Sequence, residues 1–170
     1  KYVAFTQHMG DVNDLDIPAN QAVRNDGYFR LPRPALVSAF QPHMHMRGKA
    51  QCMEAIYPDI RADSARPGPA RTERLSCVSD FNFDWSITYP YADDAAPLLP
   101  AGTIIHIISW HDNTASNKHN PNPDTWLGFG PTSIDEMNFA WVTLTYLEQA
   151  DFDRKVQERQ AAERRTQQQQ

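Results

Sequence analysis

Residues 135–147, DEMNFAWVTLTYL, are rich in β-branched and aromatic residues, a composition typical of a β-strand. Met137, Phe139 and Trp141 alternate along this segment and would share one face, which suits a hydrophobic core. Working outward, four more segments predict strands: 35–48 (ALVSAFQPHMHMRG), 51–58 (QCMEAIYP), 75–91 (LSCVSDFNFDWSITYPY) and 103–110 (TIIHIISW). The 13 prolines outnumber the 7 glycines, which indicates short strands joined by rigid loops. We therefore expect an all-β fold, an antiparallel β-sandwich resembling a jelly roll.

Aromatic residues mark both the expected core and the expected surface. Phe81, Phe83 and Trp85 alternate within 75–91 and predict the core face of one strand. The long polar loop 111–133 carries Trp126 and Phe129, which are better candidates for lining a pocket or meeting a partner.

The chain divides into three parts around one domain. The length of 170 residues is that of a single domain with a real core. Residues 1–27 read as a lead-in or as the end of a preceding domain, in which KYVAFTQHM could be a strand and the rest is turn-rich; residues 28–147 are expected to form the sandwich. Residues 148–170 contain good helix formers without an apolar stripe, which predicts a solvated helix that gives way to disorder or is held by a partner.

Composition excludes two classes of partner. The net charge of −5 leaves no basic surface, which argues against nucleic-acid binding. No apolar run approaches the roughly 20 residues that a transmembrane helix needs. The sequence begins at Lys1 without a methionine or a signal peptide, which indicates a processed or truncated form.

The segment PHMHMRG, residues 42–48, places His43 and His45 one residue apart in a chain with six histidines. On a strand these side chains project to the same side, roughly 7 Å apart at a rise of about 3.3 Å per residue, and can converge on one metal ion. The alternative is a pair of half-exposed strand residues. The other donors within reach of such a site are His106, His111, Asp112 and Met137. Imidazoles suit zinc, copper, iron and nickel, a thioether favours copper, and a carboxylate would indicate non-haem iron.

Three segments in order, PHMHMRG, WHDNTASNKHNPNPDTWLGFG and TSIDEMNFAWVTLTY, resemble the copper type II, ascorbate-dependent monooxygenases. The similarity is to bacterial relatives of their C-terminal catalytic domain, the family of peptidylglycine α-hydroxylating and dopamine β-monooxygenase, and it covers residues 28–147. It implies one copper ion, Cu(I) or Cu(II), held by His43, His45 and Met137. It also implies an oxidoreductase that activates dioxygen to hydroxylate a C–H bond of a small-molecule substrate, with ascorbate as the reductant.

The resemblance also suggests neighbours for the copper and raises the question of an electron donor. Asp112, Asn113 and His111 are candidates for hydrogen bonds to the ligands, and His111 is also a candidate extra ligand; His106 is expected to pack in the sheet or donate a hydrogen bond. The full enzymes of the family carry a second copper on a preceding domain, whereas residues 1–20 hold only His8. That electron-donating domain was then removed, lies on another chain, or has been lost together with the reaction.

Two further functions stay open. One is a non-catalytic copper-binding or assembly subunit of a larger complex, which the polar tail favours. The other is a cupin-like non-haem iron dioxygenase, although Glu54 lies too far beyond His45 for the usual cupin spacing.

The two cysteines, Cys52 and Cys77, flank a charged segment at 59–74 that reads as an exposed loop. A hairpin across this loop would place the two cysteines almost opposite each other, as a disulfide or as two small buried thiols. A disulfide fits an oxidising compartment, and together with copper loading it predicts a periplasmic or extracellular bacterial protein.

Overall fold

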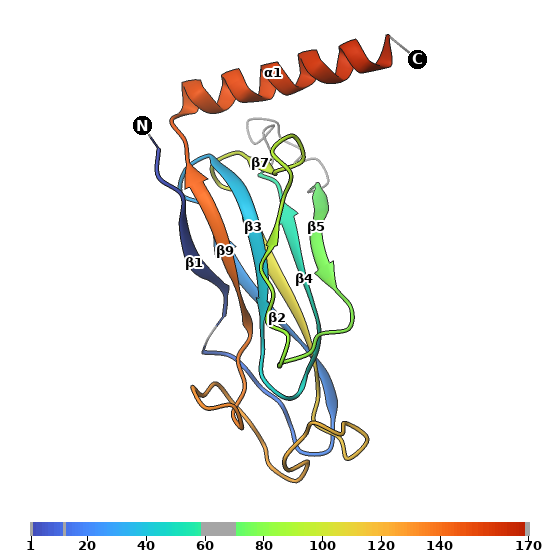
Figure 1. Ribbon diagram of the computed structural model, residues 1–170. Helices are drawn as coiled ribbons and strands as arrows, with labels where there is room; N and C mark the ends of the chain where they lie inside the picture. The colour runs from blue at the N-terminus through green and yellow to red at the C-terminus, as the bar shows by residue number, and fades with distance from the viewer. Residues whose placement is uncertain (1, 12, 59–70, 169–170) are drawn as a thin grey trace.

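The computed structural model describes residues 2–11, 13–58 and 71–168 and confirms an antiparallel β-sandwich with a C-terminal helix (Figure 1). One sheet has the strand order β1-β9-β3-β6, with β7 also paired to β3; the other has the order β2-β8-β4-β5. The elements are β1 (Phe5–Gly10), β2 (Ala22–Arg30), β3 (Ala35–His43), β4 (Gly48–Ile56), β5 (Thr72–Val78), β6 (Tyr89–Pro90), β7 (Leu98–Leu99), β8 (Ile104–Asp112), β9 (Phe139–Tyr146) and α1 (Gln149–Gln167).

The hydrophobic core lies between the two sheets and follows from alternation along the strands. In β9, Ala140, Val142 and Leu144 are fully buried, while Trp141 and the threonines between them are half-buried. The facing strands supply Met53, Ala55, Ile105 and Ile107, all at 0% exposure. Each fully buried side chain of Val, Leu or Ile size contributes about 1.5–3 kcal/mol, so this layer accounts for the register of both sheets.

Residues 1–27, expected as a lead-in, contribute a strand to each sheet. β1 pairs with β9, and β2 pairs with β8 over its whole length. The chain leaves β1 at Gly10, with φ at +125°, and passes so close to Gly27 of β2 that a Cβ on Gly27 would overlap this backbone. This contact joins residues distant in sequence, so the local turn-rich pattern could not indicate it.

The continuous strand predicted at 75–91 is wrong: β5 ends at Val78, and of the residues after it only Tyr89–Pro90 are strand, as β6. Asn82 forms local turns instead, because its carbonyl accepts the Trp85 N–H at 2.9 Å and its side chain accepts the Asp84 N–H at 3.0 Å. Such bonds compete with a strand ladder. Phe81 is still buried, but Trp85 is 67% exposed and not part of the core.

The cysteines lie opposite each other on neighbouring strands, β4 and β5. Cys52 and Cys77 are register partners, and their sulfurs are joined in a disulfide. Residues 59–70 of the expected loop between these strands lie outside the described residues.

Helix α1 lies across one end of the sandwich, and Phe152 is its one buried side chain in the described range (Figure 1). Arg159 anchors it by donating to the carbonyls of Ala96 at 2.5 Å and Asp93 at 3.0 Å. The Tyr2 hydroxyl donates to Asp151 near the start of the helix. Among the described residues, none of the helical structure is long and apolar enough to cross a bilayer.

Candidate metal centre

His43 is the last residue of β3, at the end of the sandwich opposite α1. Its register partner on β9 is Phe139, and the two ring centroids lie 4.8 Å apart. The Trp141 ring lies 6.2 Å away and the His45 ring 5.7 Å away, nearly perpendicular. Burial, with a smaller effect from the charge of His45, lowers the pKa of His43. The neutral imidazole that results is the form that binds metals.

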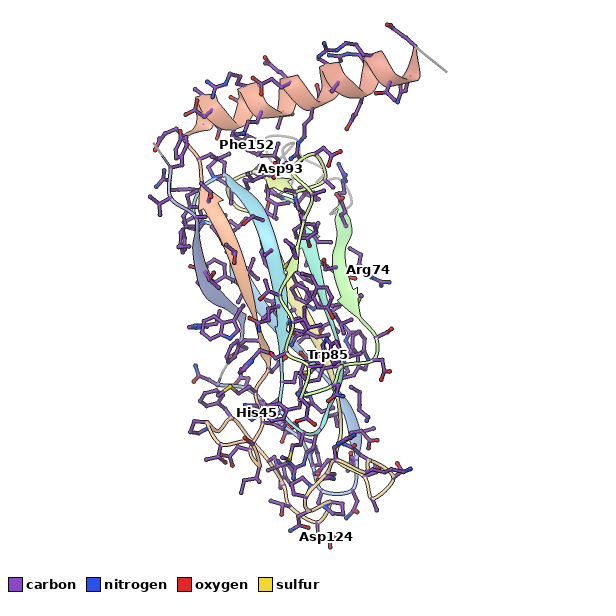
Figure 2. All side chains as sticks on the ribbon, viewed as in Figure 1. His45, Arg74, Trp85, Asp93, Asp124 and Phe152 are labelled. Carbon is purple, nitrogen blue, oxygen red and sulfur yellow. A yellow bond between two sulfur atoms is a disulfide. The ribbon has the colours of Figure 1, made fainter. Side chains whose placement is uncertain are left out.

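His45 does not belong to a strand, so the prediction of a continuous strand over 35–48 is wrong after His43. Its N–H donates to the side chain of Glu136 at 2.8 Å, and the N–H of Arg47 donates to the same carboxylate at 2.6 Å. The chain turns here between β3 and β4: the Gly48 N–H donates to the His45 carbonyl at 3.1 Å, and the carboxylate accepts the N–H groups of His45 and Arg47. Figure 2 shows His45 at the end of the sandwich away from the helix.

The ring of His45 is buried and oriented. Its Nδ1 lies 3.2 Å from the Asp135 carbonyl. A carbonyl only accepts, so the proton is on Nδ1 and Nε2 keeps its lone pair for a ligand. The Phe83 ring packs at 5.5 Å, nearly perpendicular to the imidazole. Metal-binding histidines usually donate their other ring N–H to a carbonyl or carboxylate, as His45 does to the Asp135 carbonyl.

Met137 lies between the two residues that contact the histidines. Asp135, two residues earlier, contacts His45, and Phe139, two residues later, contacts His43. Asn138 and Ala140 are buried on the opposite side of the chain, at 1% and 0% exposure. Met137 is half-buried and precedes β9, which begins at Phe139 and not at residue 135. In the sequence, Met137 thus stands between the backbone carbonyl that contacts His45 and the ring that contacts His43.

Glu136 is a fully buried carboxyl group that the sequence patterns did not single out. Besides the two bonds from His45 and Arg47, it accepts the N–H of Met137 at 3.4 Å. Burial raises the pKa of Glu136 to about 7, although the three backbone N–H groups act in the opposite direction. Its adjacency to Met137 was visible in the sequence, but its partners come from a turn roughly 90 residues away.

His111 is 1% exposed, and both of its ring nitrogens have protein partners. Nε2 lies 3.2 Å from the Met137 carbonyl and therefore carries the proton, while Nδ1 accepts from the Asn25 side chain at 3.3 Å. Burial lowers the pKa of His111 to about 4, in agreement with this neutral tautomer. These contacts make His111 a hydrogen-bond partner of the Met137 backbone and leave it no free lone pair for a metal.

Asn113 organises the long loop that follows β8. Its side-chain oxygen accepts from Arg47 Nε at 2.9 Å, and its side-chain NH₂ donates to the carbonyls of Pro18 and Thr125. The Arg47 side chain, 1% exposed, also donates to the Ile134 carbonyl at 2.9 Å. Asn113 therefore holds the loops around the site without touching the histidine pair.

The remaining predicted neighbours lie elsewhere. The Asp112 carboxylate accepts the N–H and hydroxyl of Thr114 in a local turn. His106 is on the other sheet, 2.6 Å from Asp26, and its ring stacks on Tyr28 at 4.5 Å. The structure brings neither of them to His43 and His45.

The exposed aromatic residues of the long loop lie at the surface. Trp126 is 66% and Phe129 47% exposed, and the Trp126 indole donates to Asp16 at 2.6 Å.

In the described part of the chain, no three or more His, Cys, Asp and Glu side chains are grouped so that they could hold a metal ion. No protein-family model and no curated protein matches the sequence.

Proposed function

We propose that this chain is the mononuclear copper-binding domain of a monooxygenase, with His43, His45 and Met137 as the ligands. The observation that carries the proposal is the sequence position of Met137, two residues after Asp135, whose backbone carbonyl contacts His45, and two residues before Phe139, whose ring contacts His43. Two neutral imidazoles and one thioether form a donor set that suits Cu(I).

The surrounding residues fit this role. The Asp135 carbonyl fixes the tautomer of His45, and burial keeps the His43 ring neutral. The rings of Phe139, Trp141 and Phe83 pack against the two imidazoles, limit water, and hold their orientation. Copper, when bound, would supply the one-electron and dioxygen chemistry by which the family hydroxylates a substrate C–H bond. A reductant such as ascorbate, or an electron-donating domain on another chain, would have to supply the electrons.

The nearby carboxylates favour copper over the iron of a cupin-like site. Glu136 accepts three backbone N–H groups, and Asp135 accepts the N–H and hydroxyl of Thr132 at 3.1 and 2.7 Å. The bond from the Thr132 hydroxyl, and to a smaller extent the bond from the Thr132 N–H, lower the pKa of Asp135. Both oxygens of the fully buried Glu136 already accept protein N–H groups, so the thioether is a better third ligand than this carboxylate.

The alternative function is a copper-binding or assembly subunit without catalysis. The exposed surface of α1 favours it, because a helix of this length with one buried side chain contributes little to the sandwich itself. The Cys52–Cys77 disulfide fits a periplasmic or extracellular location in either case.

The first experiment is metal analysis with X-ray absorption on the reduced, copper-loaded chain and on Met137→Ile. We expect about one copper per chain and a sulfur scatterer that disappears in the variant. Copper that is indifferent to Met137, or no copper, would overturn the proposed site. Turnover with ascorbate and oxygen then separates a monooxygenase from a non-catalytic subunit.

A further inference from the structure

Met137 precedes β9, and two side chains hold the polar groups of its backbone. Its N–H donates to Glu136 at 3.4 Å, and its carbonyl accepts from His111 at 3.2 Å. Both side chains are essentially unexposed, Glu136 at 0% and His111 at 1%. The position of Met137 thus depends on this pair of side chains.

One atom connects the two candidate ligand segments directly. The Oε2 oxygen of Glu136 accepts both the N–H of Met137 and the N–H of His45, the latter at 2.8 Å. The other oxygen accepts the N–H of Arg47 at 2.6 Å. Burying a carboxyl group is costly unless hydrogen bonds compensate for it, and an apolar side chain would fill the same space at lower cost. The donors it satisfies all belong to the two segments that carry His45 and Met137.

We infer that Glu136 and His111 are positioning residues that hold the Met137 backbone beside the His45 turn, so that its thioether can serve as a ligand to Cu(I). This inference rests on the proposed copper site and adds to it the device that keeps its sulfur ligand in place. Without Glu136, the bonds of His45 to the Asp135 carbonyl and of Arg47 to the Ile134 carbonyl would remain, but the Met137 N–H would lose its link to the His45 turn. Removing the His111 donor would free the Met137 carbonyl while leaving the turn intact.

The test compares the full-length chain with Glu136→Ala and Glu136→Gln, each reduced and loaded with Cu(I). Sulfur coordination is read by X-ray absorption, and Cu(I) affinity by competition with a chromophoric Cu(I) chelator. We expect Glu136→Ala to lose the sulfur scatterer and to bind Cu(I) about 10–100-fold more weakly, the usual effect of losing such a partner. Glu136→Gln keeps one oxygen, which can accept from both His45 and Met137, so it should restore most of the sulfur signal.

The control is Glu54→Gln, a half-buried glutamate of β4 that contacts Arg74 and lies near His106 on the other sheet. It should retain wild-type affinity and sulfur coordination. A Glu136→Ala chain with the same affinity and sulfur scatterer as the wild type would overturn the positioning role. Wild-type protein without a copper–sulfur signal would overturn the proposed function, and this outcome is recognisable before any Glu136 variant is measured.

If circular dichroism shows that Glu136→Ala does not fold, His111 carries the same test. His111→Gln can keep a donor near the Met137 carbonyl, whereas His111→Leu cannot. Loss of sulfur coordination in the Leu variant and its recovery in the Gln variant would support the inference. Wild-type sulfur coordination in both variants would refute it.

Discussion

The backbone N–H of His45 donates to the Glu136 carboxylate at 2.8 Å, across 91 residues of sequence. The bond lies just beyond the last ladder pair of β3 and β9, His43 with Phe139. It extends the contact between these two segments past the end of the β3–β9 pairing, where Glu136 forms only an isolated bridge with Phe129. The candidate site therefore begins where the β3–β9 ladder ends. Beyond that point the Glu136 side chain, in place of ladder hydrogen bonds, accepts the N–H groups of the His45 turn.

His43 and His45 are expected to be required for copper binding and dispensable for the fold. His43→Ala and His45→Ala should each weaken Cu(I) binding by more than about 100-fold. Mutating a residue that only hydrogen-bonds to a metal ligand already lowers metal affinity by about 10–100-fold. Chelator competition measures the affinity, and thermal unfolding checks that each variant is folded. His119→Ala, an exposed histidine of the long loop, is the matched control and should bind copper like the wild type. Equal losses in all three variants would contradict the site.

Tyr57 should make stability depend on pH in the alkaline range. Its hydroxyl donates to Glu73 at 2.8 Å, and burial, then that bond, raises the pKa of Tyr57 to about 12. Between its unfolded value of about 10 and the folded value, only the unfolded chain releases this proton. The folded state is then the one with more bound protons, so the free energy of unfolding falls as pH rises through this window.

Urea unfolding measures this effect at a series of pH values between about 9 and 12, a range that begins below the ordinary tyrosine pKa of about 10. Tyr57→Phe is the control and should show a shallower fall in the free energy of unfolding. Parallel curves for the two proteins would mean that Tyr57 does not keep its proton in the folded state.

The Cys52–Cys77 disulfide should stabilise the sandwich without influencing the metal site. Its cysteines are 25 residues apart, a loop for which chain entropy predicts about 3–4 kcal/mol. Cys52→Ala combined with Cys77→Ala should lower the free energy of unfolding by about that amount, measured by urea titration. Copper affinity should be unchanged, because neither cysteine contacts the histidine pair. A large loss of affinity in a folded double variant would link the disulfide to the site.

Local sequence patterns predicted the sandwich because most strands alternate within one segment. Residues 135–147 predicted a strand, but its fully buried positions are Ala140, Val142 and Leu144 and not the alternate positions, of which Met137 and Trp141 are half-buried. The failures have long-range or side-chain causes: β2 begins inside the expected lead-in and pairs with the distant β8, and Asn82 ends the alternation after β5. Neither cause produces a periodic pattern of hydrophobic residues in the sequence.

The histidine pair was predictable from spacing alone, whereas Met137 was selected by resemblance to a family. The structure adds the contacts that bracket Met137 between Asp135 and Phe139. The roles of Glu136 and Arg47 could not be predicted, because their partners lie on distant segments and a buried charge has no local pattern. For His111, sequence left open whether it would be a ligand or a neighbour, and its two hydrogen bonds favour a neighbour.

Asn113 is expected to be the residue of the long loop whose loss most damages the surroundings of the site. It is 0% exposed, and its side chain bonds Arg47 on one side and the carbonyls of Pro18 and Thr125 on the other. Asn113→Ala leaves these groups without their partner, and each such buried group costs roughly 1–3 kcal/mol. We expect the free energy of unfolding to fall by at least about 2 kcal/mol by urea titration. The exposed Asn13→Ala should change it by less than about 0.5 kcal/mol. Asn113 does not touch His43 or His45, so an Asn113→Ala variant that remains folded should still bind one copper. If a folded Asn113→Ala variant lost its copper, the loop would also hold the ligands in place, together with Glu136 and His111.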